Sequence, residues 1–133
     1  MDSEDDGNNY NILLVEDNGL NQKVVIYSLK RYGFKIDIAN NGIEAVEMFE
    51  EGKYNFILMD VMMPEMDGMQ ATRKIRSIEL SQRIPIIAIT ADSILATRDK
   101  CMACGMDGHI TKPFNVKNLF HILNELDFNL KVV

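Results

Sequence analysis

The chain alternates between short apolar runs and longer stretches in which apolar residues recur at helical spacing. Continuous apolar runs of this length are typical of strands buried on both faces of a parallel sheet. We predict buried strands over 11–15, 55–60 and 84–89, a half-covered strand over 34–39 and a short fifth strand over 109–111. The amphipathic stretches between them predict helices over 19–31, 43–49, 69–78, 93–104 and 116–126.

The same spacing predicts which side of each helix faces the core. The fourth helix has a thin apolar stripe, which fits an element that is weakly held. The third helix is expected to turn its polar residues to solvent, namely Thr72, Arg73, Lys74 and Arg76. In the first helix the apolar residues Leu20, Val24, Tyr27 and Leu29 recur at roughly helical spacing. In the last helix the residues expected to face inward are Leu119, Phe120, Ile122, Leu123 and Leu126.

Five strand–helix pairs follow one another without a long linker or a repeat. Such alternation implies an α/β fold, in which helices cover both faces of a parallel sheet and the crossovers are right-handed. A length of 133 residues suits one domain with a single core. We expect the domain to span 10–128, between a disordered acidic tail at 1–9 and a short C-terminal tail at 129–133.

Charge and hydropathy exclude several classes of function. The net charge of −6 argues against direct binding to nucleic acid phosphates or to an anionic membrane surface. No apolar run approaches the roughly 20 residues that span a bilayer. The first nine residues are acidic and polar, unlike a signal peptide.

Cys101 and Cys104 have the C-x-x-C spacing of redox pairs and of half a zinc site. A redox pair normally lies at a helix N-terminus, which lowers a thiol pKa, whereas this pair falls late in a predicted helix. A structural zinc site needs four ligands, and only His109 and His121 could supply the others. Two free thiols fit a reducing, intracellular compartment, so we expect the protein to be cytoplasmic.

Four of the five predicted strands end in residues that can carry chemistry. Glu16 and Asp17 follow the first strand, Asp60 ends the third, Thr90 follows the fourth and Lys112 follows the fifth. The carboxyl ends of parallel strands lie at one edge of the sheet, where open α/β folds bind ligands. A single aspartate after a strand is more often a cap or turn residue. The combination favours a site.

Three neighbouring carboxylates are unfavourable unless their pKa values rise or a cation lies among them. A few carboxylate oxygens suit Mg²⁺, which commonly shares its site with phosphate oxygens. An aspartate can attack a phosphoryl group and form an aspartyl phosphate. Lys112 would add positive charge and Thr90 a hydroxyl donor, which are the aids that phosphoryl transfer requires.

The chain resembles the receiver domain of two-component response regulators over residues 11–126. The resemblance rests on LVEDN at 14–18, LMDVMMPEMDG at 58–68, IAITA at 87–91 and TKPF at 111–114. It implies a doubly wound (βα)5, flavodoxin-like fold with strand order 2-1-3-4-5. The Met-Pro-Glu-Met-Asp-Gly loop at 63–68 and the Gly-Met-Asp turn at 105–107 most resemble receivers of hybrid histidine kinases and phosphorelays.

By this resemblance Asp60 is the phosphoacceptor, and Mg²⁺ or Mn²⁺ is bound by Asp17, Asp60 and the main-chain carbonyl of Met62. Glu16 would reach the metal through water. Lys112 would contact the phosphoryl group, with a cis bond to Pro113. Such a domain promotes its own phosphorylation and dephosphorylation and is not an enzyme with a separate substrate.

The resemblance also implies a conformational switch. Thr90 is the switch hydroxyl, and His109 occupies the position of the switch aromatic, which is usually Tyr or Phe. His109 could instead be a partly buried strand residue, and the sequence does not decide between the two. Met62 and Asp92 occupy positions that tune the lifetime of the aspartyl phosphate.

The usual donor for such a receiver is a histidine phosphotransfer protein or a histidine kinase. We expect a monomer whose donor docks against Asn18, Leu20, Asn21, Pro113 and Phe114.

Three alternatives compete with this interpretation. A flavin-binding protein of the same topology needs a phosphate loop where Glu16 and Asp17 stand, and an aspartate phosphatase needs a second acid where Met62 stands. The third alternative, a degenerate receiver that acts only as a protein-binding module, disagrees with the intact set of Asp17, Asp60, Thr90 and Lys112.

Overall fold

Five strands alternate with five helices along the chain, as the sequence predicts. The computed structural model describes residues 10–63, 66–91 and 95–126. The strands are β1 (Asn11–Val15), β2 (Lys35–Ala39), β3 (Phe56–Asp60), β4 (Ile86–Thr90) and β5 (Gly108–Thr111). The helices are α1 (Gly19–Lys30), α2 (Gly42–Met48), α3 (Gly68–Ile78), α4 (Leu95–Ala103) and α5 (Val116–Glu125).

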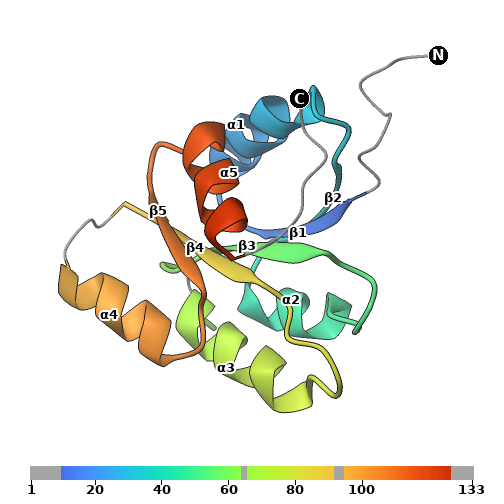
Figure 1. Ribbon diagram of the computed structural model, residues 1–133, viewed down its shortest axis with the longest axis vertical. Helices are drawn as coiled ribbons and strands as arrows, with labels where there is room; N and C mark the ends of the chain where they lie inside the picture. Colours follow the sequence, from blue (N-terminus) through green and yellow to red (C-terminus); the bar gives the residue numbers. More distant parts are fainter. Residues whose placement is uncertain (1–9, 64–65, 92–94, 127–133) are drawn as a thin grey trace.

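The strands form one parallel sheet in the order β2-β1-β3-β4-β5, which confirms the predicted topology (Figure 1). The order reverses between β1 and β3, the place where doubly wound sheets bind ligands. Val15 pairs with Met59, Asp60 with Ile89 and Thr90 with Thr111. The three central strands and β5 therefore end level with one another, and the residues just beyond them share one edge.

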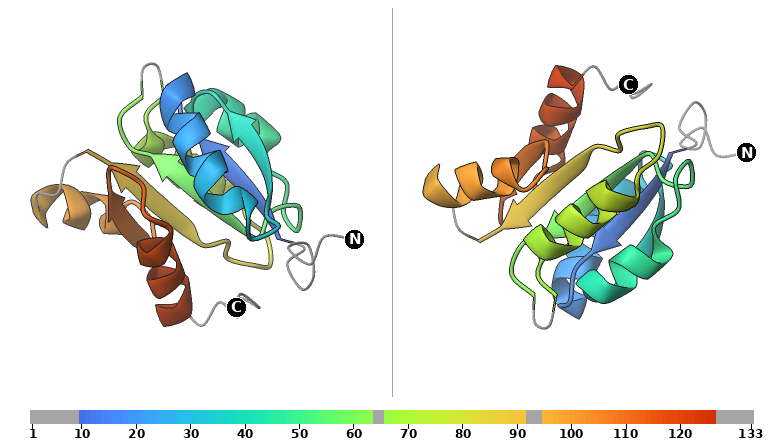
Figure 2. Two further views of the ribbon diagram at one scale, coloured as in Figure 1. Left: turned by 90° about the horizontal axis from the view of Figure 1, so that it is seen from above. Right: turned by 90° about the horizontal axis from the view of Figure 1, so that it is seen from below.

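Helices cover both faces of the sheet. Helices α1 and α5 lie on one face and α2, α3 and α4 on the other (Figure 2). Successive residues of a strand point to opposite faces and so belong to two different hydrophobic cores. In β1, Ile12 and Leu14 pack against α1 and α5, whereas Leu13 and Val15 pack on the face covered by α2, α3 and α4. Within the described residues, no helix has both the length and the apolar character needed to cross a membrane.

Side chains at the helix starts satisfy backbone N–H groups that have no partner inside the helix. Asn18, Asn41 and Asn115 accept from the first turns of α1, α2 and α5, respectively. Asp67 and Gln70 form a reciprocal capping box at the start of α3. The start of each of these four helices is therefore fixed by the sequence next to it.

The apolar pattern predicted for α1 coincides with its buried side only at Leu29. Val25 and Leu29 are buried, whereas Leu20 and Tyr27 are 72% and 83% exposed and Val24 is also exposed. Apolar residues lie on two sides of this helix, and the side that packs on the sheet is the one that contains Leu29. In α5, Leu119 and Leu123 are buried as predicted, while Phe120 and Ile122 are half-buried and Leu126 is exposed.

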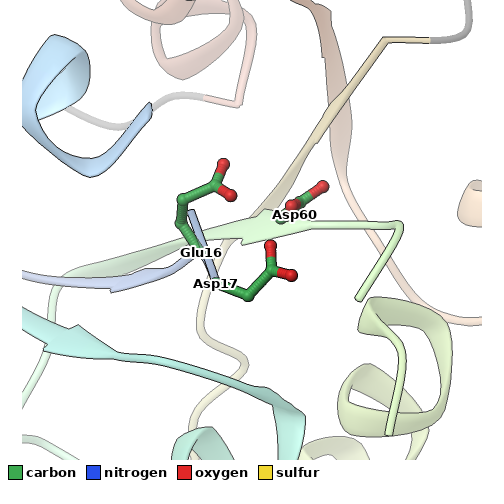
Figure 3. Close-up of side chains that lie close together, drawn as sticks. All are labelled: Glu16, Asp17 and Asp60. Carbon is green, nitrogen blue, oxygen red and sulfur yellow. The ribbon is translucent and has the colours of Figure 1, made fainter. Parts of the chain in front are cut away.

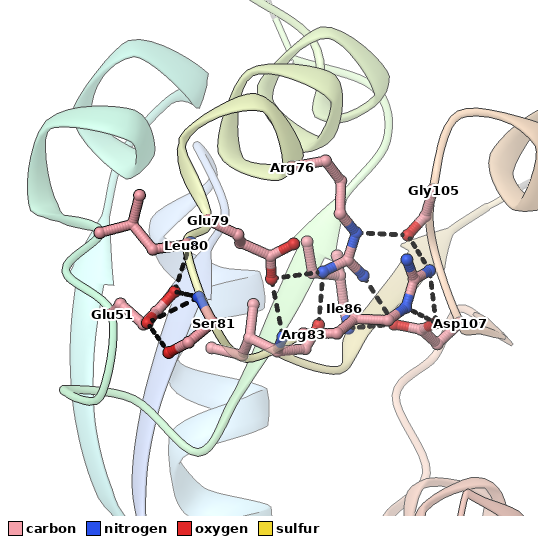
Figure 4. Close-up of polar contacts among 10 residues, drawn as sticks. Glu51, Arg76, Glu79, Leu80, Ser81, Arg83, Ile86, Gly105 and Asp107 are labelled. Atoms are coloured by element: carbon pink, nitrogen blue, oxygen red, sulfur yellow. Dashed lines mark hydrogen bonds and ion pairs between the residues drawn. The ribbon is translucent and has the colours of Figure 1, made fainter.

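The predicted solvent face of α3 is also wrong in part. Thr72 is buried and donates to the carbonyl of Gly68. The Arg76 side chain is only 13% exposed and ties α3 to the turn after α4 (Figure 4). Its guanidinium donates to the carbonyls of Gly105 and Ile84, and it pairs with Asp107 at 2.7 Å.

The end of α4 is closed by the same turn. Gly105 has a φ of 115°, its N–H bonds the carbonyl of Met102, and the N–H of Met106 bonds that of Cys101. This is the Schellman arrangement, which favours glycine at that position. Cys101 and Cys104 are buried free thiols, as expected, and Cys104 bonds the carbonyl of Cys101. They supply much of the packed side of α4.

Candidate functional site

The three predicted acids meet at the carboxyl ends of β1 and β3. One ligand oxygen from each of Glu16, Asp17 and Asp60 can be chosen so that all three lie within 4.8 Å of one another (Figure 3). Glu16 and Asp60 are each only 2% exposed, whereas Asp17 is exposed. Neighbouring residues of an extended chain point to opposite sides, which is why Glu16 turns inward and Asp17 outward.

Lys112 is the cation of this site. Its Nζ lies 3.3 Å from Oε1 of Glu16 and 3.4 Å from Oδ2 of Asp60. The other oxygen of Asp60 accepts from the N–H of Met62 at 3.2 Å, and Oε2 of Glu16 accepts from the N–H of Asn18 at 3.1 Å. Lysine therefore bridges the two buried acids, and main-chain donors hold their outer oxygens.

The pKa of Asp60 is raised to about 7 from a usual value of 3.8, first by burial and then by the neighbouring carboxylate of Glu16. Lys112 and the N–H of Met62 act in the opposite direction, and the value of about 7 is the net result. One lysine does not neutralise three carboxylates, so the ionised site favours an additional cation. Closely grouped carboxylate oxygens, with solvent access beside Asp17, fit a hard divalent ion such as Mg²⁺.

Thr90 lies one strand away from Asp60. It ends β4, is 1% exposed, and accepts the N–H of Lys112 on its carbonyl oxygen at 2.7 Å. Asp60 pairs with Ile89 in the neighbouring strand, so Thr90 continues β4 just beyond the level of the acid. The bond between Lys112 and Pro113 is cis, as the family resemblance implied.

Helix α3 begins against the backbone of Asp60. A Cβ placed on Gly68 would overlap the carbonyl oxygen of Asp60 and lie 2.9 Å from Cγ of Met59. The N–H of Gly68 donates to the carbonyl of Val61 at 3.1 Å. Sequence reasoning placed Gly68 in a motif without seeing this contact. Because glycine has no Cβ, the first residue of α3 can pack directly against the backbone of Asp60.

Several predicted residues lie around this centre. Met62 follows Asp60 and has an exposed side chain, while Asp92 falls outside the described residues. His109 is half-buried on β5 and lines a pocket of about 280 Å³ with residues of α4 and α5. Its Nε2 is buried without a hydrogen-bond partner in the described part of the chain.

The residues predicted to dock a donor lie together beside the acids. Asn18, Leu20 and Pro113 are exposed, and Asn21 and Phe114 are half-buried. A small cavity of about 70 Å³ separates α1 from the loop after β5, and Asn21, Pro113, Phe114, Glu16 and Lys112 are among the residues that line it. Val24, one of the apolar residues of the helical pattern in α1, also lines this cavity.

Comparison with known proteins identifies the family. A model described as the response regulator receiver domain matches residues 12–124. The chain belongs to this family. The predicted resemblance is thus confirmed, and strand order, acidic cluster and cis peptide all agree with it.

Relatives of this receiver domain occur within much longer proteins. It is 38% identical over 136 residues to Probable histidine kinase 4 of Oryza sativa subsp. japonica, covering 86% of this chain and 14% of the relative. The chain therefore spans about one seventh of the length of that relative.

Two solved receiver structures are also similar. The receiver domain of the sensor histidine kinase PA1611 from Pseudomonas aeruginosa PAO1 is 41% identical to this chain, with a TM-score of 0.77. The match covers 87% of this chain and 95% of that one, and that structure holds a magnesium ion in its active-site cleft. The receiver domain of Ssk1 from Saccharomyces cerevisiae, crystallised with the histidine phosphotransfer protein Ypd1, belongs to a structure that is 32% identical, with a TM-score of 0.75 and 86% of each chain covered.

Proposed function

We propose that this receiver domain accepts a phosphoryl group from a phosphohistidine onto Asp60 and then signals to a partner. The proposal rests mainly on the position of Lys112, whose ammonium group lies between the buried carboxylates of Glu16 and Asp60. A buried aspartate that belongs to an acidic cluster and has a lysine ammonium at 3.4 Å is well placed for phosphoryl transfer. A degenerate binding module would have no use for this arrangement.

The transfer forms one bond and breaks one. A carboxylate oxygen of Asp60 attacks phosphorus, the bond between phosphorus and the imidazole nitrogen breaks, and the donor histidine leaves with its bonding electron pair. Lys112 offers its ammonium to the phosphoryl oxygens as they leave the donor. Asp17, Asp60 and the Met62 carbonyl, with Glu16 acting through water, would hold Mg²⁺, and the bound ion would supply further positive charge to those oxygens.

Phosphorylation would be read out through Thr90 and His109. The Thr90 hydroxyl lies on the strand next to Asp60 and is our candidate switch residue, with His109 as the companion aromatic on β5. The phosphoryl group shifts the conformational equilibrium only by as much as it favours one state over the other. Met62 and Asp92 are our candidates for tuning its lifetime.

A histidine phosphotransfer protein or a histidine kinase is the proposed donor. Leu20, Val24 and Tyr27 recur at helical spacing as exposed apolar residues on α1, beside the cavity that reaches Lys112. Together with Asn18, Asn21, Pro113 and Phe114, this face offers apolar contacts around the acidic site. The Ssk1 receiver in complex with Ypd1 supports the choice of partner class.

The remaining proposals concern the context of the domain. We propose a monomer of about residues 10–128 that works in the cytoplasm, where the two free thiols remain reduced. It acts as a phosphorylated signalling module and not as an enzyme with a separate substrate.

The test is intact mass after incubation with acetyl phosphate, with and without Mg²⁺. We expect the wild type to gain one phosphoryl group only when Mg²⁺ is present, and Asp60→Asn to gain none. Asp99→Asn, which changes an exposed acid on α4, is the matched control and should behave as the wild type. A wild type that gains nothing from acetyl phosphate or from a phosphorylated phosphotransfer protein would refute the proposal and favour the degenerate module.

A further inference from the structure

Gln22, in the first turns of α1, reaches back to the loop from which the acids project. Its side-chain Nε2 donates to the main-chain carbonyl of Glu16 at 2.7 Å and to Oδ1 of Asn40 at 2.9 Å. Both N–H bonds of the amide are therefore used. We propose that Gln22 is a positioning residue for the acidic cluster, which holds the backbone of Glu16 and Asp17 in the geometry that binds Mg²⁺.

The backbone is where such control is needed. Asp17 is exposed, and no hydrogen bond holds its side chain among the residues that the structure describes. Its position relative to Asp60 then depends on the main chain of residues 16–18. At residue 16 that main chain is held by the bond from the Glu16 N–H to the Ala39 carbonyl at 3.1 Å and by the Gln22 side chain. At residue 18, the N–H of Asn18 bonds Oε2 of Glu16 at 3.1 Å, and the Asn18 carbonyl accepts the main-chain N–H of Gln22 at 3.0 Å.

The second acceptor of Gln22 is itself oriented. The main-chain N–H of Asn40 donates to Oε1 of Glu44 at 2.9 Å, and its side-chain Nδ2 donates to the same oxygen at 3.2 Å. With its amide nitrogen directed at Glu44, the Oδ1 of Asn40 is left facing Gln22. The glutamine thus connects α1, the loop after β1 and the start of α2 in one chain of hydrogen bonds.

Groups that orient metal ligands commonly change metal affinity by about 10- to 100-fold when they are removed. Gln22 acts through the main chain and not on a ligand atom, so we expect the low end of that range. The inference rests on the proposed function only in its choice of Mg²⁺ as the ion. It concerns affinity and not the chemistry of transfer.

Charge and geometry predict opposite orders for three variants. Gln22→Met keeps the length of the side chain and removes both donors. Gln22→Glu also removes the donors but adds a negative charge that by itself would attract Mg²⁺. Gln22→Arg keeps two N–H donors and adds a positive charge that by itself would repel it. If positioning dominates, the Arg variant binds Mg²⁺ more tightly than the Met and Glu variants, which both lack the donors. If net charge dominates, affinity falls in the order Glu, Met, Arg.

The measurement is calorimetric titration of Mg²⁺ into the metal-free chain. We expect Gln22→Met and Gln22→Glu to bind about tenfold more weakly than wild type, and Gln22→Arg to stay within about threefold. Gln82→Met, the same change at an exposed position in the loop before β4, is the control and should bind as wild type does. Unchanged affinity in Gln22→Met, or tighter binding by Gln22→Glu, would overturn the inference.

A second readout separates this inference from the proposed function. In acetyl phosphate reactions, Gln22→Met should need about tenfold more Mg²⁺ for half-maximal phosphorylation and should reach the wild-type rate at saturation. A rate that stays low at saturating Mg²⁺ would mean that Gln22 acts elsewhere, which contradicts the inference. If wild type binds Mg²⁺ but never gains a phosphoryl group, the proposed function fails while the calorimetric result for Gln22 still stands.

Discussion

Replacing Asp60 with asparagine should stabilise the metal-free domain at neutral and alkaline pH. The carboxylate is buried beside Glu16, and its pKa of about 7 lies well above the usual 3.8. Asparagine has the same shape, can still accept from the N–H of Met62, and carries no charge. The substitution therefore removes the crowding of two buried acids with little change in packing.

The sign depends on proton binding. Between about pH 4 and pH 7 the folded domain keeps a proton on Asp60 that the unfolded chain has lost, so the free energy of unfolding falls as pH rises. Because one pKa unit corresponds to about 1.4 kcal/mol, the shift from 3.8 to about 7 amounts to a total loss of roughly 4 kcal/mol, of which roughly 2–3 kcal/mol should accumulate between pH 5 and pH 8. Asp60→Asn lacks this contribution, so the two pH profiles should diverge.

Urea unfolding in EDTA at pH 5 and pH 8 measures the divergence. The other titrating groups are common to both proteins, so the difference between the two profiles reports Asp60 together with its interaction with Glu16. Adding Mg²⁺ at pH 8 should raise the stability of the wild type and leave Asp60→Asn nearly unchanged, because binding to the folded state alone stabilises it. Parallel profiles in EDTA, with or without a constant offset, would show that Asp60 is not crowded and would refute the reasoning.

Three further changes test the frame around the site. Gly68→Ala should lower the free energy of unfolding in urea by about 1–3 kcal/mol, because the added Cβ would overlap a backbone carbonyl. Gly19→Ala, with open space around it, should not lower it, and equal effects of the two substitutions would contradict this reasoning. In the same assay Arg76→Met should lower the free energy of unfolding by about 2–4 kcal/mol, since it breaks a largely buried network of ion pairs. Arg83→Met, which replaces a side chain that is 58% exposed, should lower it by only about 0–1 kcal/mol, and the reverse order would contradict this prediction. Burial raises the pKa of the Cys101 thiol to about 11, so it should react with a disulfide reagent at pH 8 only when the protein is unfolded, and rapid labelling of the native protein would disagree.

The sheet and the main features of the site were predictable because both depend on local signals. Apolar runs marked the strands, and a parallel sheet necessarily gathers the residues at the carboxyl ends of its strands along one edge. That rule was enough to bring Asp17, Asp60 and Lys112 together from the sequence alone. It could not show that Glu16 is buried beside Lys112 while Asp17 is exposed, because this depends on the pleat at the end of β1.

The predictions of helix faces failed where a helix has apolar residues on two sides, and where a side chain bonds to a residue that is distant in the sequence. Helix α1 has apolar residues on two sides, and periodicity cannot say whether Val25 or Val24 meets the sheet. Arg76 looked like a surface residue, yet its partner Asp107 lies 31 residues further on. Gln22 carried no signal, because the acceptor that it finds in Asn40 belongs to another loop.

The closed turn at Gly105 gives α4 one fixed end. Arg76 and Arg83 both donate to the Gly105 carbonyl, and the Schellman bonds lock the last turn to it. If a helix held in this way moves, we expect it to tilt about that end. Its nine residues span about 13 Å, so a displacement of about 2 Å at Leu95 is a tilt of about 8°, with almost no movement at the anchored end. The first turn of α4 would then move most, and the buried thiols of Cys101 and Cys104 would lie near the pivot, where movement is least.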